Sequence, residues 1–170
     1  MSTSTVTNGS EAQRLLAATR QIIGTVRYCW VMTAAGGGGV NARLMGRLPS
    51  LPGEDEWTVW FLTRDRSRKA GEIRLAGRLT VGYQNDADGA YAVLTGPAAL
   101  IEDRPELRRR WQDSWNVFFP GGPDNSAAIL VRIEVDCIEL CMRGVTPEPF
   151  GSRYLALERG STRQWKVVTG

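Results

Sequence analysis

The stretch that decides the fold is Trp57–Lys69, WTVWFLTRDRSRK, in which a run of aromatic and β-branched residues gives way abruptly to charged ones. Its first seven residues, Trp57–Thr63, have the composition of a buried strand, which we expect to be central in a sheet. A polar turn then leads into a short helix over Ala70–Leu75, which Gly77 ends. Exposed N–H groups and the helix dipole converge on such a turn, so the stretch predicts an anion site.

The flanking sequence predicts an antiparallel sheet with few helices. Before the decisive stretch, a capping pattern at Ser10 and Gln13 begins a helix over 11–23, whose apolar stripe we expect to lie on the sheet. A second helix is expected over 105–115, with Leu107, Trp111 and Trp115 on one face and the arginines 108–110 on the other. Further strands are expected over 26–33, 40–48, 78–84, 90–101, 127–135 and 137–142.

Consecutive hairpins, rather than crossover helices, connect these expected strands. The four glycines at 36–39 are interpreted as a hairpin tip, because no phosphate-loop signature follows them. Residues 154–157 and 165–168 form a possible terminal hairpin within an extension over 144–170. The resulting tally of six or seven strands favours a mainly β (α+β) fold, an antiparallel barrel with peripheral helices.

Composition limits the class of protein. The 170 residues suit one domain, and 42% apolar with 23% charged residues is ordinary for a soluble globular chain. No apolar run approaches the roughly 20 residues that span a bilayer, so we expect no membrane segment. The chain contains no histidine, which excludes Ser-His and Cys-His nucleophile pairs and histidine metal sites.

Cysteine usage and charge bear on compartment and partners. Cys29, Cys137 and Cys141 lack CxxC spacing and are expected to be free thiols without metal. Residues 1–9 are predicted to be flexible and show no export signal, so a cytoplasmic location is expected. The net charge of +3 comes from interleaved bases and acids, a pattern that does not favour a nucleic-acid partner.

Two basic elements are predicted to meet beside an apolar surface. Arg43, Ser67, Arg68 and Lys69 together offer the donors that a terminal phosphate needs. Leu44 and Met45 follow Arg43, and the sequence Trp60, Phe61, Leu62, Thr63 precedes the turn, which suits a ligand with a flat ring and a phosphate tail. Trp111 and Phe119 are candidates to cover that ring. A solvated basic turn and ordinary core aromatics are the alternative interpretation of the same residues.

The ordered set of these motifs, with a Gly96 break in the strand 90–101 and the segment FPGGPD from Phe119 to Asp124, resembles a known family. It is similar to the FMN-binding split-barrel family related to pyridoxamine 5'-phosphate oxidase, above all to its bacterial general-stress-protein branch. The resemblance covers about Leu16–Cys141. It implies a split barrel over 10–143 and a homodimer with FMN at the subunit interface.

The resemblance also implies roles for particular residues. Arg43, Ser67, Arg68 and Lys69 would hold the phosphate, and Leu44, Met45 and Trp60 to Thr63 would lie along the isoalloxazine ring. Trp111 and Phe119 would be contributed by the partner subunit. The family's oxidases share an Arg-x-His substrate motif that a chain without histidine lacks, so vitamin B6 oxidase activity is not expected.

Several hypotheses remain open from the sequence. The chain is expected to be a flavin-dependent oxidoreductase of unspecified substrate or a non-catalytic flavin-binding stress protein, and no catalytic residue is nominated. The alternative is a β-barrel interaction module that binds a polyanion or a protein. A deazaflavin or haem ligand is less favoured, the latter because no axial histidine exists.

Overall fold

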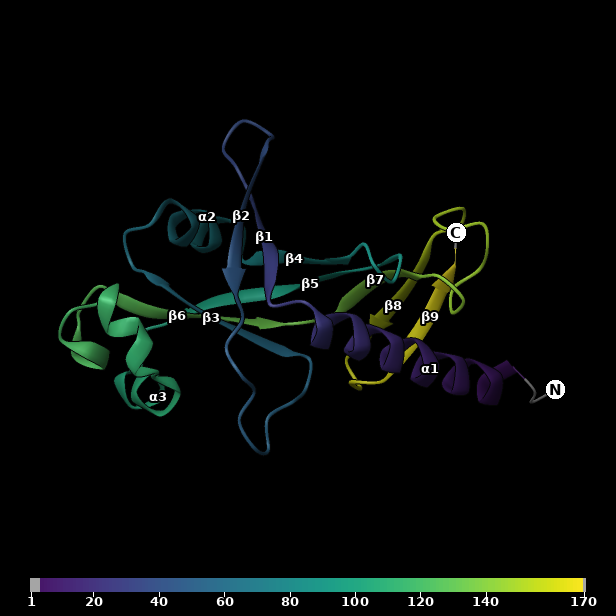
Figure 1. The fold of residues 1–170 in the computed structure, drawn as a ribbon, viewed down its shortest axis with the longest axis horizontal. Coiled ribbons are helices and arrows are strands. Elements are labelled where there is room, and N and C mark those ends of the chain that lie inside the picture. The colour runs from purple at the N-terminus through teal and green to yellow at the C-terminus, as the bar shows by residue number, and fades with distance from the viewer. Residues whose placement is uncertain (1–3, 170) are drawn as a thin grey trace.

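The computed structural model describes residues 4–169, which form nine strands and three α-helices (Figure 1). The helices are α1 (Ser4–Thr25), α2 (Arg68–Ala76) and α3 (Arg104–Arg110), with short 3-10 turns η1 (Asp113–Val117) and η2 (Gly122–Asp124) after α3. The strands are β1 (Tyr28–Ala34), β2 (Val40–Gly46), β3 (Thr58–Arg64), β4 (Arg78–Asn85), β5 (Ala90–Ile101), β6 (Ala128–Glu134), β7 (Cys137–Met142), β8 (Leu155–Arg159) and β9 (Trp165–Thr169). No helix within these residues is both long and apolar enough to cross a membrane.

All strand pairs are antiparallel, and β5 joins the two parts of the split barrel. Along one path the strand order is β2-β1-β4-β5-β7-β8-β9, while β6 pairs with both β5 and β3. Residues 90–95 of β5 pair with β7, and residues 98–101 pair with β6. The exchange of partners falls at Gly96, where an added Cβ would lie 2.0 Å from the Glu134 carbonyl oxygen. Glycine is required here because only a residue without a side chain admits the neighbouring backbone.

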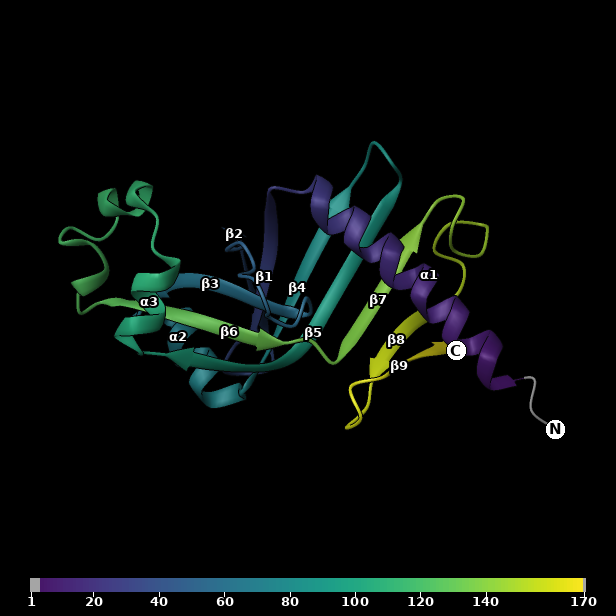
Figure 2. The ribbon, with the colours of Figure 1, turned by 90° about the horizontal axis from the view of Figure 1, so that it is seen from below.

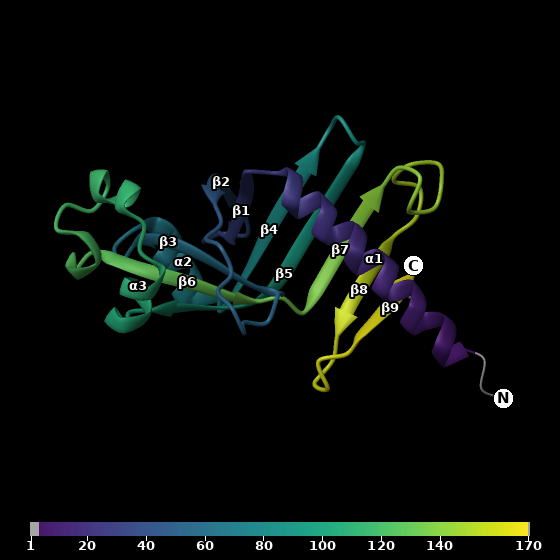
Figure 3. The same ribbon diagram turned by 60° about the horizontal axis from the view of Figure 1, so that its bottom comes forward.

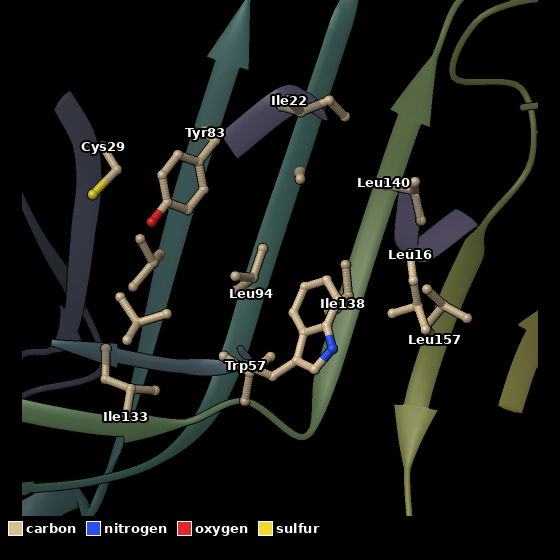
Figure 4. Packing of buried hydrophobic residues seen from close by; sticks show 14 of the residues in the cluster. Leu16, Ile22, Cys29, Trp57, Tyr83, Leu94, Ile133, Ile138, Leu140 and Leu157 are labelled. Carbon is tan, nitrogen blue, oxygen red and sulfur yellow. The ribbon is translucent and has the colours of Figure 1, made fainter. Parts of the chain in front are cut away.

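The main core lies between the sheet and α1. Helix α1 runs obliquely across the strands and contacts β4, β5, β7 and β9 (Figures 2 and 3). Its buried side chains Leu15, Leu16 and Ile22 pack on the sheet, as the apolar stripe predicted. Figure 4 shows Leu16 beside Leu140 and Leu157, and the Tyr83 hydroxyl turned toward Cys29. The three cysteines are free, as predicted.

Several predicted elements need correction. The sheet has nine strands rather than six or seven, because the terminal hairpin β8–β9 pairs with β7 and continues the sheet. Strand β3 is buried as predicted but is not central, since β6 is its only partner strand in the described range. Helix α1 begins at Ser4, so the predicted start at residue 11 is too late; residues 1–3 of the expected flexible segment lie outside the described residues.

The helix expected over 105–115 is also shorter than predicted. It ends at Arg110, and Trp111 takes an extended backbone with φ −61° and ψ 141°. Arg110 does not share the solvated side of the other arginines, because its side chain is 1% exposed, pairs with Glu54 and Glu106, and lies 3.8 Å from the Trp60 ring centroid. A buried guanidinium with two carboxylates fixes the end of α3 against the β3 side of the molecule.

Candidate functional site

A groove of about 730 Å³ opens at the seam where the barrel does not close, between β2 and β3. Across this seam, the Leu48 N–H donates to the Trp60 carbonyl oxygen at 2.8 Å. The walls come from β1 and β2, from the end of β3 with the start of α2, and from η1 and the residues beside it. The lining residues are Arg27, Tyr28, Leu44, Met45, Gly46, Arg47, Leu48, Leu62, Thr63, Arg64, Ser67, Lys69, Gln112, Ser114, Trp115, Phe118 and Phe119. Small-molecule sites typically have volumes of about 300–1,000 Å³, so the groove has a suitable size for one.

One wall of the groove contains the start of α2. Ser67 is the N-cap, with an extended backbone, and its Oγ accepts from the Ala70 N–H at 3.3 Å. The Thr63 hydroxyl lies 3.3 Å from the Ser67 hydroxyl, so the end of β3 and the cap are in hydrogen-bonding contact. The first N–H groups of a helix have no acceptor within the helix. They lie at the positive end of the helix dipole, which favours the binding of an anion. The strand, turn and helix start predicted from the sequence are therefore in place.

Lys69 supplies the cation on this wall. Burial lowers the pKa of its ammonium, and the positive charge of Arg43 lowers it further. Within residues 4–169, no carboxylate lies at ion-pair distance from the Lys69 nitrogen. A partly buried cation that lacks a counter-ion and faces a groove is an electrostatic cost that a bound anion would relieve.

Arg43 lies apart from the groove lining. Its guanidinium donates to Thr33 Oγ1 at 2.6 Å and to Glu72 Oε2 at 3.3 Å. Glu72 also accepts from Thr33 and Asn41, and these hydrogen bonds, foremost the one from Thr33, hold the pKa of the Glu72 carboxyl below its usual value. This network fastens α2 to the β1–β2 hairpin. Contact between Arg43 and a phosphate therefore stays a prediction, as does that of Arg68, whose side chain is 71% exposed and lies 3.6 Å from Glu72.

The predicted apolar wall divides between the groove and the interior. Leu44, Met45, Leu62 and Thr63 line the groove. The neighbouring β3 residues Trp60 and Phe61 are buried instead: Trp60 belongs to a small cluster with Leu48 and Phe119, and Phe61 belongs to the main core.

Trp111 and Phe119, the two aromatic residues expected to cover a ring, lie at different places in the structure. Phe119 lines the groove, with the Arg64 guanidinium 4.8 Å from its ring centroid. Trp111 packs edge to face against Trp115 and Phe119, with ring centroids 5.5 Å and 6.2 Å away, and lines a different depression next to Gly121 and Gly122.

Sequence reasoning missed several lining residues, above all the cations Arg27, Arg47 and Arg64. Arg64 was visible as the first residue of the basic turn, but Arg27 and Arg47 lie at the ends of two expected strands with no motif around them. With Lys69 they give the groove four cations, and none of its described lining residues is Asp or Glu. The groove is thus suited to an anionic ligand with an apolar part.

Comparisons with known proteins agree with this fold. The model of the family "Pyridoxamine 5'-phosphate oxidase like" matches residues 16–140. No curated protein matches the chain. Similar solved structures include a protein related to general stress protein 26 from Clostridium acetobutylicum, with a TM-score of 0.67 and 17% identity over 77% of this chain and 90% of that one.

Two further structures are described as flavin binders. One is a pyridoxamine 5'-phosphate oxidase-related, FMN-binding protein from Nostoc punctiforme, with a TM-score of 0.65 and 16% identity over 93% of this chain and 95% of that one. The other is a general stress FMN/FAD-binding protein from Xanthomonas citri, with a TM-score of 0.62 and 16% identity over 81% of this chain and 93% of that one. At these identities the structural likeness establishes the fold.

Proposed function

The chain belongs to the pyridoxamine 5'-phosphate oxidase-like family, and on that premise we propose that it binds FMN in the groove between β2 and β3. The observation that carries the proposal is the state of Lys69. Its ammonium group is partly buried, has no carboxylate partner in the described chain, and lies at the start of the helix that borders the groove. The similar structures from Nostoc punctiforme and Xanthomonas citri, which are described as FMN-binding and FMN/FAD-binding, support a flavin as the ligand.

The residues of the groove fit the two parts of FMN. The phosphate would be held by the Lys69 ammonium, the Ser67 hydroxyl and the first amides of α2, all of them donors. The isoalloxazine ring would lie along Leu44, Met45 and Leu62, with Phe119 on the facing wall. In this arrangement Arg43 does not contact the phosphate. Its guanidinium stays hydrogen-bonded to Glu72, and its positive charge lowers the pKa of Lys69.

Bound flavin supplies redox chemistry that the side chains of this protein cannot supply themselves. We therefore propose a flavin-dependent oxidoreductase or a flavin-binding general stress protein, in keeping with the similar structures described as general stress proteins. The role of the chain is to bind and orient the ring and to shield it from water. Pyridoxamine phosphate oxidase activity is not proposed, because the chain has no histidine to complete the Arg-x-His motif.

A homodimer is proposed on the outer face of the β1–β2 hairpin. Tyr28, Trp30 and Leu44 are 53%, 45% and 57% exposed, and Trp30 and Leu44 are cross-strand partners. Exposed apolar side chains of this size, grouped beside a ligand groove, favour an interface. A second copy on this face would cover the groove and contribute to flavin binding. The free thiols support a cytoplasmic location for this dimer.

Flavin affinity tests the proposal. The purified protein should show a flavin absorption spectrum, or acquire one with FMN, and should bind FMN more tightly than riboflavin. Removing a charge-assisted contact costs about 1.5–3 kcal/mol, so Lys69→Ala should weaken FMN binding by about ten- to a hundredfold while leaving riboflavin affinity nearly unchanged.

The matched control is Lys166→Ala, which removes the only other lysine of the chain, an exposed residue of β9. It should bind FMN like the unmodified protein. Equal loss of FMN and riboflavin affinity in Lys69→Ala would contradict the assignment of the phosphate to this wall. A protein that takes up no flavin and instead binds polyanions in a salt-sensitive way would be an interaction module.

A further inference from the structure

We infer that Arg27 and Arg47 form a second anion subsite, which binds the carboxylate or phosphate group of a small substrate. The inference rests on the proposed function, since the subsite lies in the groove assigned to the flavin. Arg27 directly precedes β1 and Arg47 directly follows β2, so both flank the cross-strand pair formed by Tyr28 and Gly46. Neither residue belongs to the phosphate wall at the start of α2.

The two arginines stand where the groove meets a second cavity. This cavity has a volume of about 360 Å³ and shares only Arg27, Arg47 and Leu48 with the groove. Its other walls are the end of α1 and the segment after β2, and it includes no residue of α2. An anion between the two guanidinium groups would therefore be reached from the groove and would lie away from Lys69.

Arg27 and Arg47 are among the few arginines of the described chain that have no protein acceptor. Most of its arginines donate to a carboxylate or a carbonyl, as Arg20 does to Glu56 and Arg78 to Asp136. Within residues 4–169, Arg27 and Arg47 have neither an ion pair nor a hydrogen bond to a protein acceptor. Both side chains are exposed and line the same two cavities, so an oxyanion could accept from both of them.

Local packing holds one of the two guanidinium groups in position. The Tyr28 ring lies over Gly46, where an added Cβ would be 3.8 Å from its Cε1 atom. The Arg27 guanidinium in turn lies 5.2 Å from the centroid of the Tyr28 ring. Stacking on an aromatic ring leaves the planar donors of arginine free at their edge, which is the side that binds a carboxylate or phosphate.

The end of α1 could explain the position of Arg27 without a bound anion, but it does not explain the position of Arg47. A cation after a helix complements the negative end of its dipole. Two of the last carbonyls of α1 already accept hydrogen bonds, Ile22 from the Thr25 hydroxyl at 2.9 Å and Ile23 from the Val26 N–H at 3.4 Å. Arg47 follows β2, where its charge acts on Cys29 and Tyr83, and no helix end accounts for its place beside the groove.

The test uses the FMN-loaded protein and three probes of similar shape, namely benzoate, phenyl phosphate and uncharged benzamide. Binding is followed by the change in the visible flavin spectrum. Benzoate or phenyl phosphate should bind at least about tenfold more tightly than benzamide, and the stronger of the two identifies the anion. Arg27→Gln and Arg47→Gln should each weaken the anionic probe by about tenfold or more, with FMN affinity within about threefold of the unmodified protein.

Arg153→Gln is the matched control, because Arg153 is also an exposed arginine without a partner in the described chain but lies outside both cavities. It should leave probe affinity unchanged. Equal affinity for benzoate and benzamide, or unchanged benzoate and phenyl phosphate binding in both glutamine variants, would overturn the subsite. A parallel loss of FMN affinity would overturn it too, by assigning the arginines to the flavin.

Failure of flavin binding would be a separate result. If the unmodified protein takes up no flavin, benzoate and phenyl phosphate are titrated calorimetrically into the flavin-free protein and its Arg27→Gln/Arg47→Gln variant. Binding that the double variant loses would support the subsite without the proposed function. No heat of binding from the unmodified protein would refute both.

Discussion

Gly96 is the position at which one added methyl group should do the most damage to the fold. An ideal Cβ there would lie 2.0 Å from the Glu134 carbonyl oxygen, 2.7 Å from the Glu134 carbonyl carbon and 2.9 Å from the Val135 Cα. All three atoms are backbone, so no side chain can rotate away. Gly96→Ala therefore requires β5 and the end of β6 to move apart by about 1 Å to reach the 3.0 Å limit of real Cβ contacts, and by about 1.4 Å to reach an ordinary contact of 3.4 Å.

The expected cost follows from the kind of atoms that must move. Overpacking a well-packed interior costs about 1–3 kcal/mol when neighbours can relax, and a clash with backbone belongs at or above the upper end. We expect Gly96→Ala to lower the free energy of unfolding by about 3 kcal/mol or more, which for a chain of this size lowers Tm by roughly 6–12 °C. Because the strand pair β3–β6 is attached to β5 here, the variant should also weaken the FMN binding proposed for the groove.

The assay is urea unfolding monitored by tryptophan fluorescence, with thermal unfolding as a second readout. Gly71→Ala is the matched control, since nothing lies within 4 Å of an added Cβ at that position in the middle of α2. Alanine is the better helix former, so this control should gain about 0.5–1 kcal/mol. A Gly96→Ala variant within about 0.5 kcal/mol of the unmodified protein would refute the close approach of β5 and β6.

Two charged residues give further predictions. Hydrogen bonds lower the pKa of Glu72 in the folded protein, so its stabilisation is present above the ordinary value of 4.5 and is lost as the pH falls through the folded-state pKa. Glu72→Gln should be less stable than the unmodified protein at pH 7, and the difference should shrink toward pH 3 in urea unfolding measured across that range. Arg110→Ala leaves Glu54 and Glu106 without their buried partner and should cost about 3 kcal/mol of unfolding free energy. The exposed control Arg153→Ala should change that free energy by less than about 0.5 kcal/mol, and an equally small change in Arg110→Ala would contradict the role of the buried pair.

Elements set by local pattern were predictable from the sequence. The bounds of β5 and β7 agree with the prediction: Gly89 precedes the alternating start of β5, and Asp136 and Gly144 lie on either side of β7. The Gly77 cap of α2 was also correct, with φ 63° as a left-handed cap requires. The predicted extent of the helix over 105–115 was wrong. The spacing of four between Leu107, Trp111 and Trp115 suggested one continuous helix, but the helix ends at Arg110, and Trp111 and Trp115 pack against each other beyond its end.

The lining of the groove was predictable only in part. The basic turn and the apolar β3 end were visible in one stretch, and Leu62, Thr63, Ser67 and Lys69 do meet at the groove. The partner of Arg43 could not be read from the sequence, because Glu72 reaches it only once α2 has packed beneath the β1–β2 hairpin. Arg27 and Arg47 were missed for a similar reason: they are distant in sequence and share a wall only through the register of β1 and β2.

The open seam explains why the groove lies where it does. In a fully closed barrel, β2 and β3 would pair along their length, and the backbone groups and side chains at the seam would be used in pairing and packing. Here the Leu48–Trp60 hydrogen bond brings the two segments together at one point, and Leu44, Met45 and Leu62 are left to line a groove. The same opening places the start of α2 on one wall, so apolar side chains and helix-end donors face a common space. A substitution that closed the seam should stabilise the sheet and abolish the proposed flavin binding in the groove.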